Sequence, residues 1–137
     1  MSTPVLGIVL GICLKKEKNM ATTVKEILNM VSSYLACYHF GWPVVPTAEE
    51  YLKRFIVIDF EEDEAVPCLR FRRKYLESIG VSSPVTTAVL NSAIERAGEG
   101  RNNVLWCYKL EHIAPMVEVA NLGLFVEETW KGFFVKW

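Results

Sequence analysis

Apolar residues recur along this chain with two periods, one typical of helices and one typical of strands. Over residues 23–40 they recur at helical spacing, and Thr23 and Glu26 form a capping box that opens a helix. A second Thr-x-x-Glu pattern, at Thr47 and Glu50, predicts another, shorter helix. This part of the chain is therefore expected to be largely helical.

Short runs of β-branched and aromatic residues predict the strands. One run covers 55–60, and a second covers 104–110 with 116–120 as its pairing partner. Residues 123–137 are predicted to form two strands around a central turn, which makes a hairpin. Together these patterns predict an α+β fold: a single compact domain over residues 1–137, with short and mainly antiparallel strands.

An uncharged apolar run at 4–14 is a candidate for a membrane segment. The run has 11 residues, whereas a helix that crosses a bilayer needs about 20. No basic residues precede it and no small-residue cleavage site follows it, so it does not match a secretory leader. We predict a buried strand here, within an N-terminal segment (1–19) that is absent if Met20 is the true start, and we expect no membrane contact.

Composition is that of an ordinary globular domain. Apolar residues make up 51% and charged residues 23%, and the net charge of −1 means that any nucleic-acid contact must come from a local basic patch. The four cysteines stand among apolar residues without a C-x-x-C pair. This predicts buried, reduced thiols, a cytoplasmic location and no bound metal. The cysteines are Cys13, Cys37, Cys68 and Cys107.

The acidic run at 61–64 is the candidate for metal-dependent chemistry. Carboxylates at the end of a strand can hold Mg²⁺ in a nuclease. That chemistry also needs a carboxylate and a lysine on a neighbouring strand, and the residues that follow contain no Glu-x-Lys. We therefore predict a solvated loop. No nucleophile, base and orienting group stand in a recognisable arrangement, so the chain is predicted to be non-catalytic, without a cofactor or a small-molecule substrate.

A basic segment follows at 67–80. Four cations stand close together, and Glu77 is the one acid of the segment. The pattern fits a strand that changes into a helix, or a helix that begins near Pro67. The cations either pair with the acidic run at 61–64 or bind phosphate groups, and the sequence does not separate these two readings. The cations are Arg70, Arg72, Arg73 and Lys74.

Residues 75–97 form a helical corner. The run Ile-Gly-Val-Ser places Gly80 where the first helix must end in a left-handed residue. Val81 is expected to tuck between the two helices, and Ser82 or Ser83 to cap the second one before the proline that follows. This stretch resembles the turn of the helix-turn-helix family, and the wider segment 67–120 resembles the winged-helix variant, with 104–110 and 116–120 as the wing.

The resemblance implies DNA binding through the second helix. Its outward residues are expected to be Thr86, Thr87, Asn91 and Arg96, and its buried side to comprise Val85, Ala88, Val89 and Leu90. Of the outward set, Thr87 and Asn91 are expected to contact bases. The expected phosphate contacts are Arg70, Arg73, Lys74 and Arg101.

The chain's last stretch favours assembly. An uncovered aromatic hairpin at 123–137 is a natural surface for a homodimer, since aromatic residues are enriched where partners pack. The expected interface residues are Phe125, Trp130, Phe133, Phe134 and Trp137. The sequence thus favours a small, dimeric, intracellular DNA-binding protein, a candidate transcriptional regulator. The alternative is a non-catalytic interaction or oligomerisation module in which the helical corner is structural.

Overall fold

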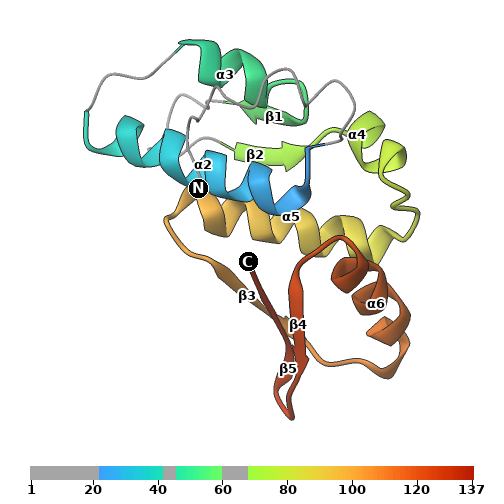
Figure 1. The fold of residues 1–137 in the computed structure, drawn as a ribbon. Helices are drawn as coiled ribbons and strands as arrows, with labels where there is room; N and C mark the ends of the chain where they lie inside the picture. Colours follow the sequence, from blue (N-terminus) through green and yellow to red (C-terminus); the bar gives the residue numbers. More distant parts are fainter. Residues whose placement is uncertain (1–21, 42–45, 60–67) are drawn as a thin grey trace.

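The computed structural model describes residues 22–41, 46–59 and 68–137, and it shows an α+β domain (Figure 1). The α+β prediction is confirmed. The predicted strand at 4–14 and the acidic run at 61–64 lie outside the described residues. In chain order the described elements are α2 (Val24–His39), α3 (Pro46–Leu52), β1 (Ile56–Asp59), β2 (Cys68–Phe71), α4 (Arg73–Ser78), α5 (Pro84–Gly98), β3 (Asn103–Cys107), the 3₁₀ turn η1 (Leu110–His112), α6 (Ile113–Asn121), β4 (Phe125–Glu128) and β5 (Gly132–Lys136).

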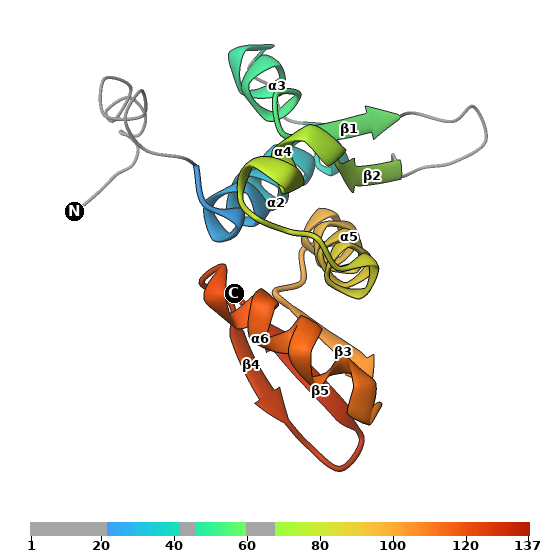
Figure 2. The same cartoon turned by 90° about the vertical axis from the view of Figure 1, so that its right-hand side faces the viewer.

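Helix α5 lies at the centre of the molecule, between two small antiparallel sheets. The two-stranded sheet β1–β2 lies on one side of it with α2, α3 and α4, and the three-stranded sheet lies on the other side with α6 (Figures 1 and 2). The helix packs against α2, β2, β3 and α6. Its buried residues are Thr86, Val89, Leu90, Ala93, Ile94, Ala97 and Gly98.

Helix α2 begins with the predicted capping box. The Thr23 N–H donates to Glu26 Oε1 at 3.1 Å, and the Glu26 N–H donates to Thr23 Oγ1 at 3.2 Å. The apolar stripe of α2 packs against α5, where Gly98 lets the helices approach closely: a Cβ atom there would lie 2.9 Å from Leu35 Cδ1. The stripe consists of Val24, Ile27, Leu28, Val31 and Leu35.

Helix α3 exists as predicted, but its start differs from the prediction. It begins at Pro46, so Thr47 lies inside the first turn and is not the residue that caps it. Proline suits this position because its fixed backbone angle matches the helix and its missing N–H is not needed there. The Tyr34 hydroxyl of α2 donates to Glu49 Oε1 of α3, which lowers the pKa of Glu49 while burial opposes that change.

The basic segment changes from strand to helix, which selects one of the two predicted alternatives. Strand β2 pairs with β1 in antiparallel register, with Ile56 opposite Phe71 and Asp59 opposite Cys68. Leu69 and Phe71 point into the core, as the alternating pattern of a half-buried strand requires. Helix α4 then begins at Arg73.

The predicted wing is wrong. Strand β3 pairs with β5 of the C-terminal hairpin, and residues 116–120 lie in α6 instead of a strand. Met116 and Val119 are the buried residues of α6, and their spacing of three is helical. A short apolar run carries both periods, and here contact with α5 and β4 selects the helix. The predicted C-terminal hairpin is confirmed as β4 and β5.

The described cysteines are more exposed than predicted. Cys68 and Cys107 are exposed and Cys37 is half-buried, while Cys13 lies outside the described residues. Both exposed thiols stand at the ends of strands, on residues whose side chains alternate away from the core. In the part of the chain that the structure describes, no helix is long and apolar enough to span a bilayer.

Replacing Gly132 by alanine is expected to destabilise the C-terminal sheet. Gly132 lies opposite Cys107, and a Cβ atom on it would come within 2.1 Å of the Trp106 carbonyl oxygen. The main chain of β3 would have to move, so Gly132→Ala is expected to lower the free energy of unfolding by about 2 kcal/mol or more. Urea denaturation measures the change, with the exposed neighbour Lys131→Ala as the control. Equal stability of the two variants would show that the clash is absent.

Candidate nucleic-acid interface

The helical corner has the local geometry that the sequence predicts. Gly80 has a φ of 87°, in the left-handed region, and Val81 is buried. The Val81 N–H donates to the Leu76 carbonyl at 3.0 Å, which closes the end of α4. Ser83 caps α5: its Oγ accepts from the N–H groups of the second and third helical residues, and Pro84 takes the first position. These features of the corner are confirmed, and the likeness to a DNA-reading family stays a hypothesis.

A groove of about 450 Å³ opens beside this corner, between β2, α4 and α5. It gathers the four cations of the basic segment and the two α5 residues that the sequence assigns to base contact. No carboxylate is among its lining residues, so the groove presents positive charge and neutral hydrogen-bonding groups together. The residues that line it are Val57, Arg70, Phe71, Arg72, Arg73, Lys74, Leu76, Thr87 and Asn91.

The four cations of the groove differ in how they are held. Arg70 Nη1 lies 3.2 Å from Asp59 Oδ2, and both side chains are about half exposed, so solvent screens this ion pair. The Arg72 Nε donates to the Lys53 carbonyl at 2.7 Å, which fixes its guanidinium against the end of α3. Arg73 and Lys74 are exposed, and no carboxylate among the described residues lies within ion-pair distance of either. The alternative pairing with the acidic run at 61–64 concerns residues outside the described ones.

Asn91 has a structural role beside its predicted role as a base reader, which stays a prediction. Its Oδ1 accepts from the Phe71 N–H at 2.8 Å, so the side chain joins α5 to strand β2. Reading adenine takes both the oxygen and the nitrogen of an asparagine side chain. The oxygen already accepts one bond within the fold, so a base would have to share it with the Phe71 N–H.

The predicted outward face of α5 is wrong in two places. Thr86 is fully buried, and its hydroxyl donates to the Pro115 carbonyl of α6 at 3.3 Å. Ala88, which the pattern assigned to the buried side, is exposed. The reason is that α5 is covered by four elements, so only a narrow part of its surface remains open. Thr87 stays partly exposed on the groove.

Arg101 lies away from the groove, although the sequence grouped it with the phosphate contacts. It follows the C-terminal end of α5 at Gly98, and the helix from Asn91 to Gly98 alone rises by roughly 10 Å. Its Nε lies 3.7 Å from Glu99 Oε1, and Arg96 Nη1 lies 4.0 Å from the same carboxylate oxygen. Arg72, which the prediction omitted, takes a place in the groove instead. The sequence could have indicated this, because Arg72 comes two residues after Arg70, and alternate residues of a strand lie on the same face.

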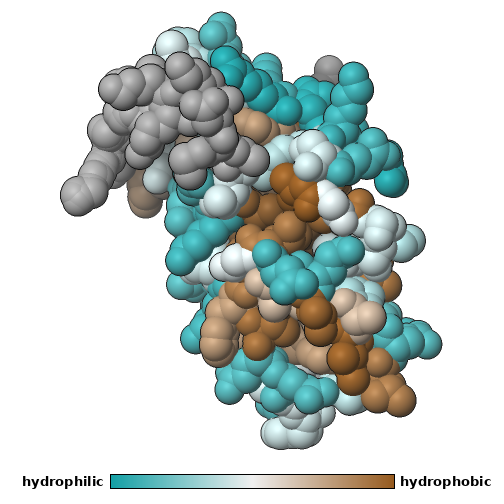
Figure 3. All heavy atoms as spheres, turned by 45° about the vertical axis from the view of Figure 1, so that its right-hand side comes forward, coloured by the Kyte–Doolittle hydropathy of each residue, from teal (hydrophilic) through white to brown (hydrophobic). Residues whose placement is uncertain are grey.

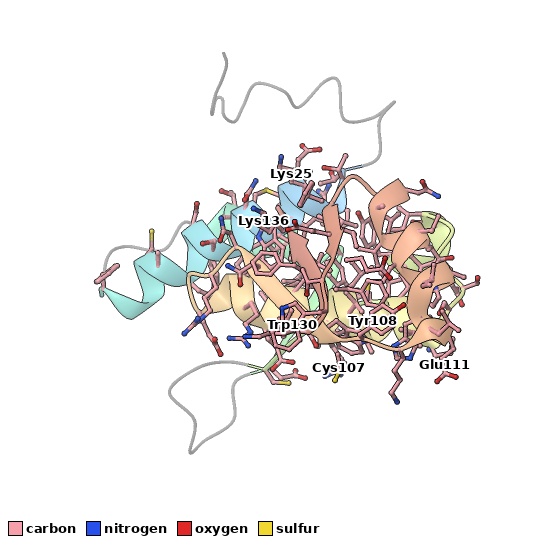
Figure 4. All side chains as sticks on the ribbon, turned by 90° about the horizontal axis from the view of Figure 1, so that it is seen from below. Lys25, Cys107, Tyr108, Glu111, Trp130 and Lys136 are labelled. Carbon is pink, nitrogen blue, oxygen red and sulfur yellow. The ribbon has the colours of Figure 1, made fainter. Side chains whose placement is uncertain are left out.

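The aromatic residues of the C-terminal hairpin do not form one surface. Phe133 is buried in the core and stacks on Tyr108, with ring centroids 5.1 Å apart, which removes it from the predicted interface. Trp137 and Phe134 are half-buried. Phe125 is 55% exposed and Trp130 is 87% exposed. Trp130 lies at the hairpin tip, where Tyr108, Glu128 and Thr129 line a shallow pocket with it (Figure 4).

No family model matches the chain, and neither a curated protein nor a solved structure matches it. Within the described ranges, no three His, Cys, Asp or Glu side chains come close enough together to hold a metal ion. The groove is the place where described residues gather charge of one sign in a concave site.

Asn91→Ala is expected to destabilise the protein, because the Phe71 N–H would lose its acceptor. The free energy of unfolding should fall by about 1–3 kcal/mol. Asn91→Asp keeps an oxygen at the same position and should cost less, and Ser92→Ala is a control on the same helix. Urea denaturation of the three variants measures the order. If Asn91→Ala proved as stable as Ser92→Ala, the hydrogen bond from the Phe71 N–H to Asn91 would contribute nothing measurable to the free energy of unfolding.

Proposed function

We propose that this chain is a small intracellular, cytoplasmic protein that binds double-stranded DNA and serves as a transcriptional regulator. The supporting observation is the groove between β2, α4 and α5, in which four cations meet two neutral polar side chains without a carboxylate among the lining residues. Five of the six residues that the sequence nominates for DNA contact line this one groove.

Phosphate binding accounts for the charge pattern of the groove. Cations that neutralise phosphates release condensed counterions, and this release supplies much of the affinity for DNA. The net charge of the chain is −1, so the molecule as a whole gives no general attraction to DNA. Binding must come from the basic segment, where Arg73 and Lys74 are exposed and Arg72 is held in place by the Lys53 carbonyl.

Contacts with phosphates, more than contacts with bases, are expected to dominate. Helix α5 is covered by four elements, and Asn91 Oδ1 already accepts a hydrogen bond from β2. Thr87 is the partly exposed α5 side chain left on the groove for a base edge or a phosphate. Weak sequence preference follows, because contacts with phosphates carry no sequence information directly.

A second candidate function is a protein-interaction or oligomerisation module. It is supported by the large apolar residues that the part of the chain after α5 leaves exposed. Figure 3 shows apolar surface over the lower part of the molecule, where α6 and the three-stranded sheet lie. Under this alternative, the helical corner at 75–97 has only a structural role in the core. The exposed residues include Leu105, Leu110, Ile113, Val117, Phe125 and Trp130.

Removing two cations from the groove is expected to weaken binding to duplex DNA of any sequence. Arg73→Ala with Lys74→Ala should reduce affinity and lower the steepness of its salt dependence by about 2 on logarithmic axes, since each phosphate contact contributes about 0.9. The matched control is Arg96→Ala with Arg101→Ala, which removes the same charge at the far end of α5 and should leave the slope unchanged. Fluorescence anisotropy over a range of salt concentrations gives both quantities, and circular dichroism verifies folding.

Two outcomes would count against the proposal. One is the absence of binding to random duplex at low salt with protein at tens of micromolar. The other is equal loss of affinity in both double variants, which would mean that charge in general, and not the groove, attracts the DNA. The first result would leave the interaction-module reading as the better account, and the second would remove the groove as the DNA site.

A further inference from the structure

The C-terminal sheet has two edges, and they differ in chemistry. Its strand order is β3-β5-β4, so β5 is central and each of the others has one side without a described partner strand. In Figures 1 and 2 no described element lies beyond β3 on the side away from β5. An open strand edge is a template for pairing with another chain unless something blocks it.

The hydrogen-bonding groups on the free side of β3 follow from the register. Val104 lies opposite Val135 and Trp106 opposite Phe133, and the Trp137 N–H donates to the Asn102 carbonyl at 3.2 Å. Antiparallel pairs alternate between bonded and non-bonded positions, so the even-numbered residues of β3 bond to β5. The N–H and C=O groups of Asn103, Leu105 and Cys107 therefore point away from the sheet.

Only one of the two edges is protected by charge. Strand β4 carries Glu127 and Glu128 in four residues, and carboxylates on an edge oppose pairing with a copy of the same strand. Strand β3 has the sequence NVLWC, without a charge, a proline or a glycine. At its centre, Leu105 is 52% exposed. The exposed thiol of Cys107 lies at its end (Figure 4).

We propose that β3 pairs with β3 of a second copy of this chain, in antiparallel register about a two-fold axis at Leu105. This register uses all five residues of the strand and places Asn103 of one copy opposite Cys107 of the other. Three bonded positions with two bonds each give about six hydrogen bonds across the axis. The two three-stranded sheets become one continuous sheet of six strands.

The side chains of β3 fit a second copy, and the like charges that flank the strand have a nearby carboxylate. By the alternation of the strands, Leu105 shares the outer face of the sheet with Phe134, opposite it on β5. Pairing therefore joins two apolar patches into one. Outside the strand, Arg101 of one copy comes opposite Lys109 of the other, and Glu99, 3.7 Å from Arg101, offsets that repulsion. Dimerisation is independent of the DNA groove, which belongs to the other sheet.

Oligomeric state in solution tests the pairing. Sedimentation equilibrium and light scattering at tens of micromolar should give a dimer for the unaltered chain. Leu105→Lys places two like charges opposite each other at the axis and should give a monomer. Leu105→Pro should do the same, because it removes only an outward N–H and edge strands tolerate proline there. The matched control is Phe125→Lys, an equally exposed residue on the same face of the opposite edge, which should remain dimeric.

Crosslinking tests the register. In a background where Cys13, Cys37 and Cys68 are serine, Asn103→Cys should give a covalent dimer under mild oxidation, through bonds to Cys107 of the other copy. Asn103→Cys combined with Cys107→Ser should give no covalent dimer, because in this register residue 103 of one copy lies far from residue 103 of the other. Non-reducing electrophoresis reads out both.

Three results would overturn the proposal. A monomer at these concentrations would exclude the dimer. Loss of the dimer in Phe125→Lys as well as Leu105→Lys would assign assembly to the face of the sheet and not to its edge. Crosslinking of the Asn103→Cys, Cys107→Ser variant would refute the two-fold axis at Leu105.

Discussion

The packing of α5 against four other elements is the constraint on which the rest of the structure depends. A two-stranded sheet such as β1–β2 is marginal by itself and needs packing against a helix. The elements on both sides of α5, those around the two-stranded sheet and those around the three-stranded sheet, pack against this helix. The helix meets this demand with small and branched residues: Gly98 admits α2 closely, and Thr86 bonds its hydroxyl to the Pro115 carbonyl of α6. A larger side chain at either position would push α5 away from the helix that packs against it there.

This role of α5 also decides where a ligand can bind. A helix that packs against elements on both of its sides cannot offer a whole face to a partner. Within the described residues, a polar link to the two-stranded sheet runs from the Phe71 N–H to Asn91 Oδ1. Charge is carried instead by the segment that enters α4, where Arg73 and Lys74 begin a short helix with exposed side chains. The groove thus lies beside α5, where exposed cations stand next to core residues such as Phe71 and Leu76.

Sequence predicted the features that depend on near neighbours in the chain. The capping box of Thr23 and Glu26, the left-handed Gly80 and the C-terminal hairpin each follow from a few adjacent residues, and all are present. The features that failed depend on contacts far along the chain. The exposure of Ala88, the burial of Thr86 and the helical state of 116–120 are decided by which elements cover each face. Arg101 was grouped with the phosphate contacts because of its charge, but it follows the far end of α5 and does not line the groove.

Positive charge is concentrated in one short part of the chain. Residues 70–77 hold four cations against one carboxylate, whereas residues 103–137 hold three cations against four carboxylates. The near-zero total of the chain therefore conceals a local cationic segment. Such a segment orients a protein as it approaches a polyanion, with the cationic patch leading. The sheet that carries β3 would then face away from the phosphates, so its open edge stays free to pair while the groove is occupied.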